Sequence, residues 1–286
     1  MVLGHGIGTE QSAWDAQVEA LVQAGYRVLT FDFAGATRES EHFFSPSRYE
    51  TLYGLAEDIL VVLQGLQIEA PVYIGHSMGG MAGLLAAVAE PARFRGLIAL
   101  GASARYLDDP ASGYIGGFST AQMEMLLQSA QEDYAQWANG FAPAMVGASN
   151  PYLSAEDFTR KLLALRPDIV HTFLRTALRA DLRAEVKRLR TPLYLLQTAE
   201  DQAVPMSAAR WLAEHGHARR LIEVPTQGHL PHITAPEAVN QALLACLRGR
   251  VASWWIPDAI FRLSRMPLAA TGKIDKMRLR SEYGGN

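Results

Sequence analysis

The stretch that most constrains the fold runs from Val72 to Gly80, where an apolar segment breaks into Gly-x-Ser-x-Gly and then into small residues. This pattern predicts a strand, a sharp turn and a helix, with Ser77 at the tip of the turn. Gly75 and Gly79 fit this turn because a Cβ at either position would collide with the neighbouring strand and helix. Ser77 is therefore a candidate nucleophile, and the rest of the chain has to supply its partners, because a motif of this size is weak evidence by itself.

Strand-like and helix-like segments alternate on both sides of this turn. Residues 26–32 and 96–100 are rich in strand-forming residues, whereas residues 14–24 and 53–66 carry apolar residues at helical spacing. Strands resume at 191–197 and 221–224, and residues 236–247 have the pattern of a closing helix. The alternation predicts an α/β fold with a mostly parallel sheet of about six strands and helices on both faces.

The alternation stops between residues 103 and 190. Helical segments are expected around 120–137, 154–165 and 167–179, with no convincing strand among them. Such an insertion is most simply a helical cap over the carboxyl edge of the sheet, where α/β proteins bind their ligands. We therefore expect a core of residues 1–103 and 191–249, a helical lid of residues 104–190 and a tail of residues 250–286.

A serine hydroxyl is barely nucleophilic at neutral pH, so it needs an imidazole to take its proton and a carboxylate to orient that imidazole. In a parallel sheet these groups come from loops at the carboxyl ends of strands. Asp201 follows the strand predicted at 191–197, and His229 follows a glycine directly after the last strand. The chain order Ser77, Asp201, His229 is the one expected of an α/β-hydrolase.

Other residues compete for both roles. Glu200 and the pair Asp108 and Asp109, which comes after an earlier strand, are alternative acids. His232 is the alternative base, but the position of His229 after a glycine in a post-strand turn favours His229.

Acyl transfer also needs two backbone N–H donors for the oxyanion, one from the residue after the nucleophile and one from the turn after an earlier strand. Met78 and Ile7 hold these positions, the latter in the turn His-Gly-Ile-Gly of residues 5–8. The glycines of this turn lack the spacings of nucleotide-binding loops, and no pair of residues has convincing metal-ligand spacing. We therefore expect neither a cofactor nor a metal. His76 is expected to be a buried, hydrogen-bonded histidine.

The composition narrows the class of partner. A net charge of −3 and a pI near 6.2 give no basic field for nucleic acid. No basic and apolar leader opens the sequence, and no apolar run approaches the length of a membrane span. The single cysteine, Cys246, lies in an apolar helical pattern and fits a core position in a reducing compartment. We expect a cytoplasmic protein that binds neither nucleic acid nor membrane.

With these residues in place, the chain resembles one branch of the α/β-hydrolases, which contains the bacterial stress regulator RsbQ and the plant strigolactone and karrikin receptors. The resemblance covers about residues 2–247, and its lid stretches carry the most weight because Gly-His-Ser-x-Gly occurs across the whole superfamily. The matching stretches are residues 5–8, 11–14, 48–52, 75–78, 116–118, 137–143 and 228–232.

The resemblance implies a V-shaped helical lid over a deep apolar pocket. The residues that it places at the site are Ser77, Asp201 and His229 as the triad, Ile7 and Met78 as the oxyanion donors, and Phe118, Trp137 and Phe141 facing the ligand.

Two features depart from this family. The chain starts at the strand that is third in the family, so two family strands are absent and residues 28–31 are expected to form an unprotected sheet edge. Residues 254–258 and 266–276, which include Lys273, resemble the end of an acyl-adenylate-forming ligase. The chain has no large ligase domain to hold ATP and an acid, so we expect the tail to be a basic appendage without adenylation activity.

The sequence therefore predicts a serine hydrolase that cleaves a small, largely apolar carboxylic ester or lactone through an acyl-enzyme. The alternative is a ligand sensor that uses the same kind of pocket for signalling and binds a protein partner, as the resemblance allows.

Overall fold

A single parallel sheet forms the centre of the computed structural model, which describes residues 1–147 and 149–247 of the chain. Its six strands follow the order β2-β1-β3-β4-β5-β6, and all neighbouring strands are parallel. They are β1 (Val2–Gly4), β2 (Leu29–Phe31), β3 (Val72–His76), β4 (Gly96–Leu100), β5 (Leu193–Glu200) and β6 (Arg220–Gln227). The predicted α/β architecture is confirmed, and β2 lies at the sheet edge. The ligase-like tail with Lys273 lies outside the described residues.

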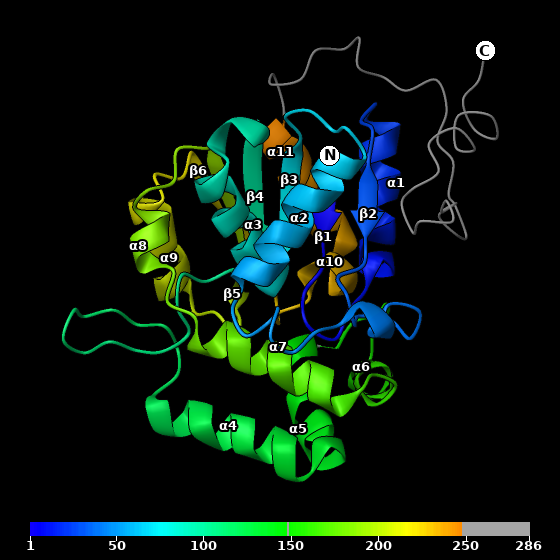
Figure 1. Cartoon of the computed structure of the whole chain (residues 1–286), viewed down its shortest axis with the longest axis vertical. Helices are drawn as coiled ribbons and strands as arrows, with labels where there is room; N and C mark the ends of the chain where they lie inside the picture. Colours follow the sequence, from blue (N-terminus) through cyan, green and yellow to red (C-terminus); the bar gives the residue numbers. More distant parts are fainter. Residues whose placement is uncertain (148, 248–286) are drawn as a thin grey trace.

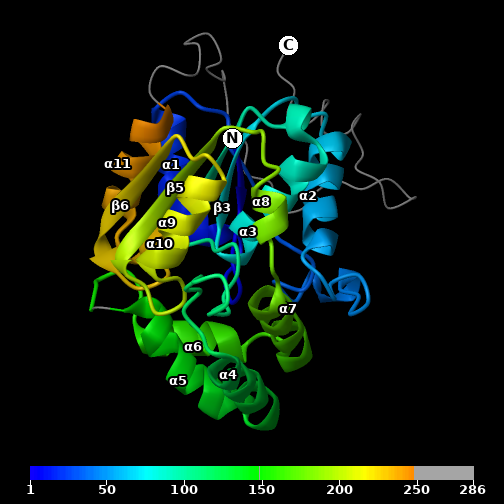
Figure 2. The ribbon, with the colours of Figure 1, turned by 90° about the vertical axis from the view of Figure 1, so that its left-hand side faces the viewer.

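Helices cover both faces of the sheet (Figure 2). One face carries α1 (Asp15–Gln23) and α11 (Pro236–Leu247), and the other carries α2 (Tyr53–Gly65), α3 (Met78–Ala89), α8 (Arg183–Val186) and α9 (Met206–His215). Shorter helices are η1 (Gln11–Trp14), η2 (Glu41–Phe43), η3 (Pro91–Arg93) and α10 (Pro231–Thr234). Each face of the sheet buries its own apolar core. Cys246 belongs to α11 and is buried in the core between this helix and the sheet. In the described part of the chain, no helix combines the length and apolar character needed to cross a membrane.

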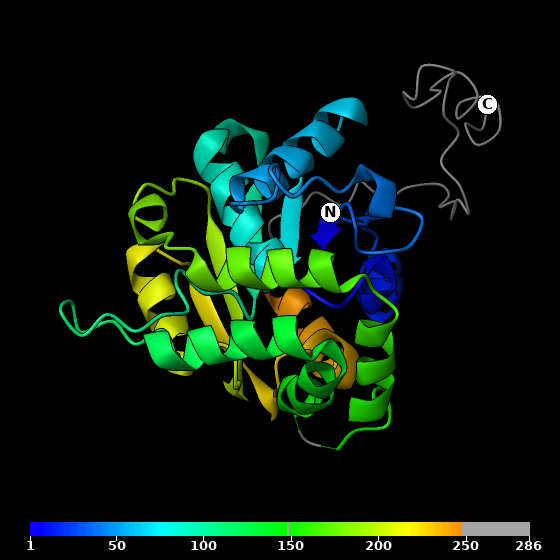
Figure 3. The same ribbon diagram turned by 60° about the horizontal axis from the view of Figure 1, so that its bottom comes forward.

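Four further helices lie together at one end of the sheet (Figures 1 and 3). They are α4 (Thr120–Glu132), α5 (Tyr134–Val146), α6 (Ala155–Leu163) and α7 (Pro167–Arg179). The helix expected around 120–137 is in fact two helices, because Asp133 interrupts it. The Asp133 carboxylate accepts a hydrogen bond from the Gln136 N–H at 2.9 Å and so caps the start of α5.

The turn between β3 and α3 adopts the strained geometry that its sequence predicts. Ser77 has φ of 50° and ψ of −121°, a conformation that L-residues rarely adopt and that costs roughly 1–3 kcal/mol. A Cβ on Gly75 would lie 2.6 Å from the Gly80 Cα, and one on Gly79 would lie 2.3 Å from the His5 carbonyl oxygen. The two glycines therefore let strand, turn and helix approach one another closely enough to hold Ser77 in place.

Replacing Gly75 by alanine should destabilise the protein by roughly 2 kcal/mol or more, because the new methyl group would meet backbone atoms that cannot rotate away. Gly65→Ala is the matched control, since no described residue has an atom within 4 Å of a Cβ at that position in α2. Alanine should leave stability unchanged there, or raise it by up to about 1 kcal/mol. Urea unfolding of both variants measures the difference. Equal stability of the two variants would contradict the packing argument.

Candidate active site

Ser77 lies at the carboxyl end of β3, in the centre of the sheet. Its backbone N–H donates to the Leu100 carbonyl at 2.9 Å, which ties the turn to the end of β4. The side chain is buried, with only 6% of the residue exposed. The hydroxyl therefore faces the protein interior and meets few competing water molecules.

Asp201 follows β5 and His229 follows β6, and the His229 side chain lies between those of Asp201 and Ser77. The Ser77 Oγ lies 2.8 Å from the His229 Nε2, and the His229 Nδ1 lies 2.8 Å from the Asp201 Oδ2. An ionised carboxylate only accepts hydrogen bonds, so the proton of a neutral His229 belongs on Nδ1. The Nε2 lone pair is then free to accept the serine proton.

Asp201 is held firmly in its orientation. Its Oδ1 accepts the backbone N–H groups of Ala203 at 2.8 Å and Val204 at 3.1 Å. Its Oδ2 accepts a third hydrogen bond from the Gln197 Nε2 at 3.0 Å, beside the bond from His229. These bonds leave the carboxylate little freedom to turn away from the imidazole.

The His229 loop packs against the end of α5. The His229 N–H donates to the Met145 carbonyl at 2.7 Å, and the Gly228 N–H donates to the Glu200 carbonyl at 2.7 Å. Gly228 has φ of 89°, and a Cβ on it would lie 2.4 Å from the Val146 carbonyl oxygen. The glycine before the histidine thus allows the α5 end to sit directly on the loop that carries the imidazole.

The competing acids occupy other places. The Asp108 Oδ1 accepts the N–H groups of Gly116 at 2.8 Å and Gly117 at 2.9 Å, so it stabilises its own loop. Glu200 is the exposed last residue of β5, and no contact between its side chain and His229 is present among the described residues.

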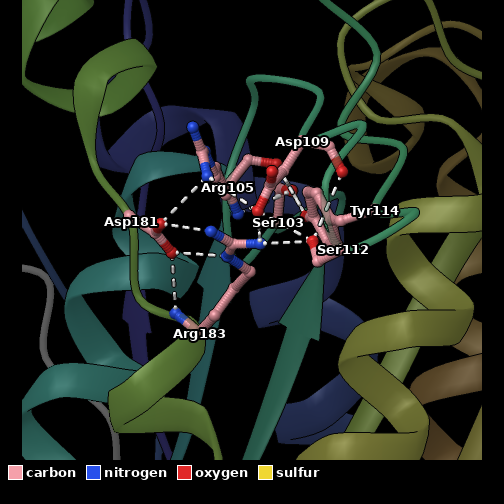
Figure 4. A network of polar contacts seen from close by, with 7 residues as sticks. All are labelled: Ser103, Arg105, Asp109, Ser112, Tyr114, Asp181 and Arg183. Atoms are coloured by element: carbon pink, nitrogen blue, oxygen red, sulfur yellow. Dashed lines mark hydrogen bonds and ion pairs between the residues drawn. The ribbon is translucent and has the colours of Figure 1, made fainter.

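Asp109 belongs to a polar network at the base of the inserted helices (Figure 4). Its carboxylate pairs with Arg183 at 2.7 Å, and the hydrogen bond from Arg183 lowers its pKa to about 2. Arg183 also pairs with Asp181 at 2.8 Å, and Asp181 pairs with Arg105 at 3.2 Å. The network joins the segment that enters the insertion to the segment that leaves it. The Asp109 carboxylate is paired with Arg183 in this network.

Ile7 and Met78, the predicted oxyanion donors, both lie close to Ser77. Met78 is the first residue of α3, where a backbone N–H has no acceptor within the helix. Ile7 lines the cavity that contains Ser77. A Cβ on the preceding Gly6 would lie 3.2 Å from the Ser77 Cβ, so this glycine allows the first turn of the chain to approach the serine. Both positions suit amide donors to an oxyanion next to Ser77.

Two neighbouring cavities are lined by the predicted pocket residues. An inner cavity of about 50 Å³ contains Ser77 and His229 and is walled by Phe118 and Phe141 among other apolar residues. Trp137 does not line it, although it is buried in the same group of helices. Trp137 instead lines an outer groove of about 520 Å³, which Phe118 and Phe141 also line.

Tyr106 is a site residue that the sequence argument missed. Its hydroxyl lies 3.4 Å from the Ser77 Oγ, and burial raises its pKa to about 12. A neutral phenol can therefore donate a hydrogen bond beside the nucleophile. The available signal was its position shortly after β4, at the edge of the sheet where Ser77, Asp201 and His229 also lie.

Three neutral imidazoles lie behind the site. His5, His76 and His232 are each at most 1% exposed, and burial lowers the pKa of all three, that of His232 to about 3. The expectation for His76 is confirmed, because its Nε2 lies 2.7 Å from the His229 carbonyl oxygen. His232 packs against the Trp14 and His76 rings, and neither of its ring nitrogens has a hydrogen-bond partner among the described residues. It is therefore not placed to act as the base for Ser77.

Comparisons with known proteins identify the family. Residues 1–242 match the alpha/beta hydrolase family, and the chain therefore belongs to it. It is 37% identical over 254 residues to Karrikin insensitive 2 receptor IA of Petunia hybrida, covering 88% of this chain and 92% of that relative. It is 36% identical over 248 residues to Strigolactone esterase D14 of Arabidopsis thaliana, covering 86% and 91%. These relatives agree with the branch that the motifs indicated.

A solved hydrolase from Oleispira antarctica has the same fold, with a TM-score of 0.82 at 24% identity over 87% of this chain and 90% of that chain. The family match ends before residue 250, so it gives no support to the ligase resemblance of the tail.

Stability should decrease as the pH falls from about 6.5 to about 4. His232, whose pKa burial lowers to about 3, stays neutral in the folded protein over this range, and burial also lowers the pKa of His5 and of His76, whereas the unfolded chain protonates these histidines near pH 6.5. The unfolded state then binds more protons, so each histidine lowers the free energy of unfolding by up to about 1.4 kcal/mol per pH unit. Urea unfolding at several pH values in this range measures the slope.

His232→Phe isolates one of these histidines. The substitution removes a titrating ring whose nitrogens make no hydrogen bond within the described part of the chain, so stability above pH 7 should be retained. The pH slope should become shallower by about 1.4 kcal/mol per unit, the equivalent of one proton. A slope equal to that of the wild-type protein would show that His232 does not contribute.

Proposed function

We propose that this protein is a serine esterase that cleaves a small, largely apolar carboxylic ester or lactone. The observation that carries the proposal is the continuous chain of contacts from Ser77 through His229 to Asp201, with 2.8 Å at each step. Ser77 and His229 line a cavity with mostly apolar walls. Such a chain activates a hydroxyl for attack on a carbonyl carbon. The esterase named among the relatives supports the same reaction class.

In the proposed reaction, His229 Nε2 takes the proton from the Ser77 hydroxyl as the Oγ attacks the ester carbonyl carbon. The N–H groups of Ile7 and Met78 donate to the resulting oxyanion. His229 then gives its proton to the leaving alcohol oxygen as the carbon–oxygen bond breaks, which leaves an acyl-enzyme. A water molecule, activated by the same imidazole, releases the acid and restores Ser77.

Residues 104–190 are proposed to act as the lid of this site. The segment supplies Phe118, which precedes α4, and Phe141 of α5 to the inner cavity, and it contacts the His229 loop through Met145. An apolar lid excludes water, which strengthens the electrostatic interactions on which acyl transfer depends. For residues 250–286 we propose an appendage that takes no part in hydrolysis.

A second candidate function is that of a ligand sensor with a hydrolase-type pocket and a protein partner for signalling. The observation that favours it is the receptor name of the petunia relative. A sensor needs to bind its ligand and change state, whereas an esterase needs to complete many reaction cycles. Kinetics over many equivalents of substrate therefore distinguish the two.

Ser77→Ala should reduce hydrolysis of p-nitrophenyl acetate by roughly 10⁴-fold or more, because the attacking oxygen is lost. Release of nitrophenol over many equivalents measures the turnover, and loss of labelling by a fluorophosphonate reports the nucleophile directly. A variant with near wild-type turnover would refute the assignment of Ser77. A wild-type protein that stops after one equivalent would favour the sensor.

Asp201→Asn should lower kcat by roughly 10³- to 10⁴-fold, because an amide no longer holds the proton of His229 on Nδ1. Asp108→Asn is the matched control. Asparagine keeps an oxygen that can accept the Gly116 and Gly117 N–H groups, so its kcat should stay within about twofold of wild type. Steady-state kinetics of both variants provide the test, and the opposite ranking would transfer the role of acid to Asp108.

A further inference from the structure

The outer groove, lined mainly by α4 and α5, lies next to the reaction site. It shares four apolar residues with the inner cavity: Phe118, Leu126, Phe141 and Met145. The inner cavity, at about 50 Å³, is too small for both halves of an ester larger than a simple acetate. The groove, at about 520 Å³, has space for the larger half.

The groove borders the loops that carry Asp201 and His229. Gln202, the residue after Asp201, lines it, and so does Met145, whose carbonyl accepts the His229 N–H at 2.7 Å. In the proposed reaction His229 protonates the alcohol oxygen, so the alcohol half of the substrate must lie next to this loop. The groove is therefore the space that the alcohol half enters.

The groove has apolar walls and an acidic rim. Trp137 and Phe141 stack on each other with ring centroids 4.7 Å apart and offer an aromatic surface. Glu132 and Asp133 lie exposed at the rim, and no lysine, arginine or histidine is among the described residues that line the groove. Their hydrogen-bond partners are uncharged: Gln128 for Glu132 and the backbone N–H of Gln136 for Asp133. No cation among the described residues that line the groove therefore pairs with these two carboxylates.

We infer that this groove binds the alcohol half of the ester and selects it by charge, accepting apolar alcohols that are neutral or cationic and disfavouring anionic ones. The inference rests on the proposed esterase function, since it assigns the two halves of the substrate relative to His229. The attraction or repulsion acts near the surface, where water and salt weaken it, so the expected discrimination is moderate.

The test compares three acetate esters that differ only in the alcohol: 2-naphthyl acetate, its 6-sulfonate and its 6-trimethylammonium derivative. Each is hydrolysed by the wild type and by the double variant Glu132→Gln/Asp133→Asn, in which asparagine retains the cap of α5. The double variant should raise kcat/KM for the sulfonate roughly three- to tenfold and lower it similarly for the trimethylammonium ester. The neutral ester should change by less than about twofold, and added salt should reduce both shifts.

Glu19→Gln/Glu214→Gln is the matched control, because it removes two acidic charges from α1 and α9, away from the groove. This control variant should leave the kcat/KM values of all three esters unchanged. Calorimetry of the free alcohols with the Ser77→Ala variant gives a readout without turnover, and the cationic alcohol should bind more tightly than the anionic one.

The two proposals fail in different ways. If neither p-nitrophenyl acetate nor any of the three naphthyl esters is turned over, the esterase proposal fails and the groove inference falls with it. If p-nitrophenyl acetate is turned over and none of the naphthyl esters is, the groove inference alone is overturned. If the esters are turned over but the rim variant shifts the ratios no more than the control, the groove inference is overturned and the esterase proposal stands.

Discussion

The backbone of Ser77 is the constraint on which the rest of this structure depends. A residue with φ of 50° persists only where its surroundings leave it no alternative. Here glycines bring β3, α3 and the first turn of the chain so close together that an added methyl group at Gly75 or Gly79 would overlap backbone atoms. The strain is offset by the packing of the central strands and by the hydrogen bond from the Ser77 N–H to the end of β4.

The parallel sheet converts distant sequence positions into one site. Because its strands run in the same direction, their carboxyl ends and the loops that follow lie along one edge. Ser77, Asp201 and His229 follow β3, β5 and β6, and this edge brings them within hydrogen-bond distance. Burial lowers the pKa of the neighbouring His76 and His232, so these imidazoles stay neutral near pH 7. They place no repulsive positive charge beside His229, the residue proposed to accept the serine proton.

Two kinds of contact hold the inserted helices in place at this edge. Ion pairs fasten the two ends of the insertion to each other, and they are formed by Arg183, Asp109, Asp181 and Arg105. The end of α5 rests directly on the loop of His229 through the Met145 carbonyl. The helices therefore shape the space around Ser77 and also hold the imidazole, so a change in their position would affect both.

The sequence alone determined what depends on local chemistry and chain order. The turn around Ser77, the alternation of strands and helices, and the order of Ser77, Asp201 and His229 all follow from residue types and spacing, because sterics and periodicity act over a few residues. It could not determine the interruption at Asp133, where a local cap outweighs helical periodicity. Nor could it place Trp137 in the outer groove or Tyr106 beside Ser77, because these contacts arise only when elements distant in the chain pack together. Only the tertiary structure decided these positions. It also decided the contacts of Asp108, Asp109 and His232, because residues of the same chemical type differ only in the surroundings that packing gives them.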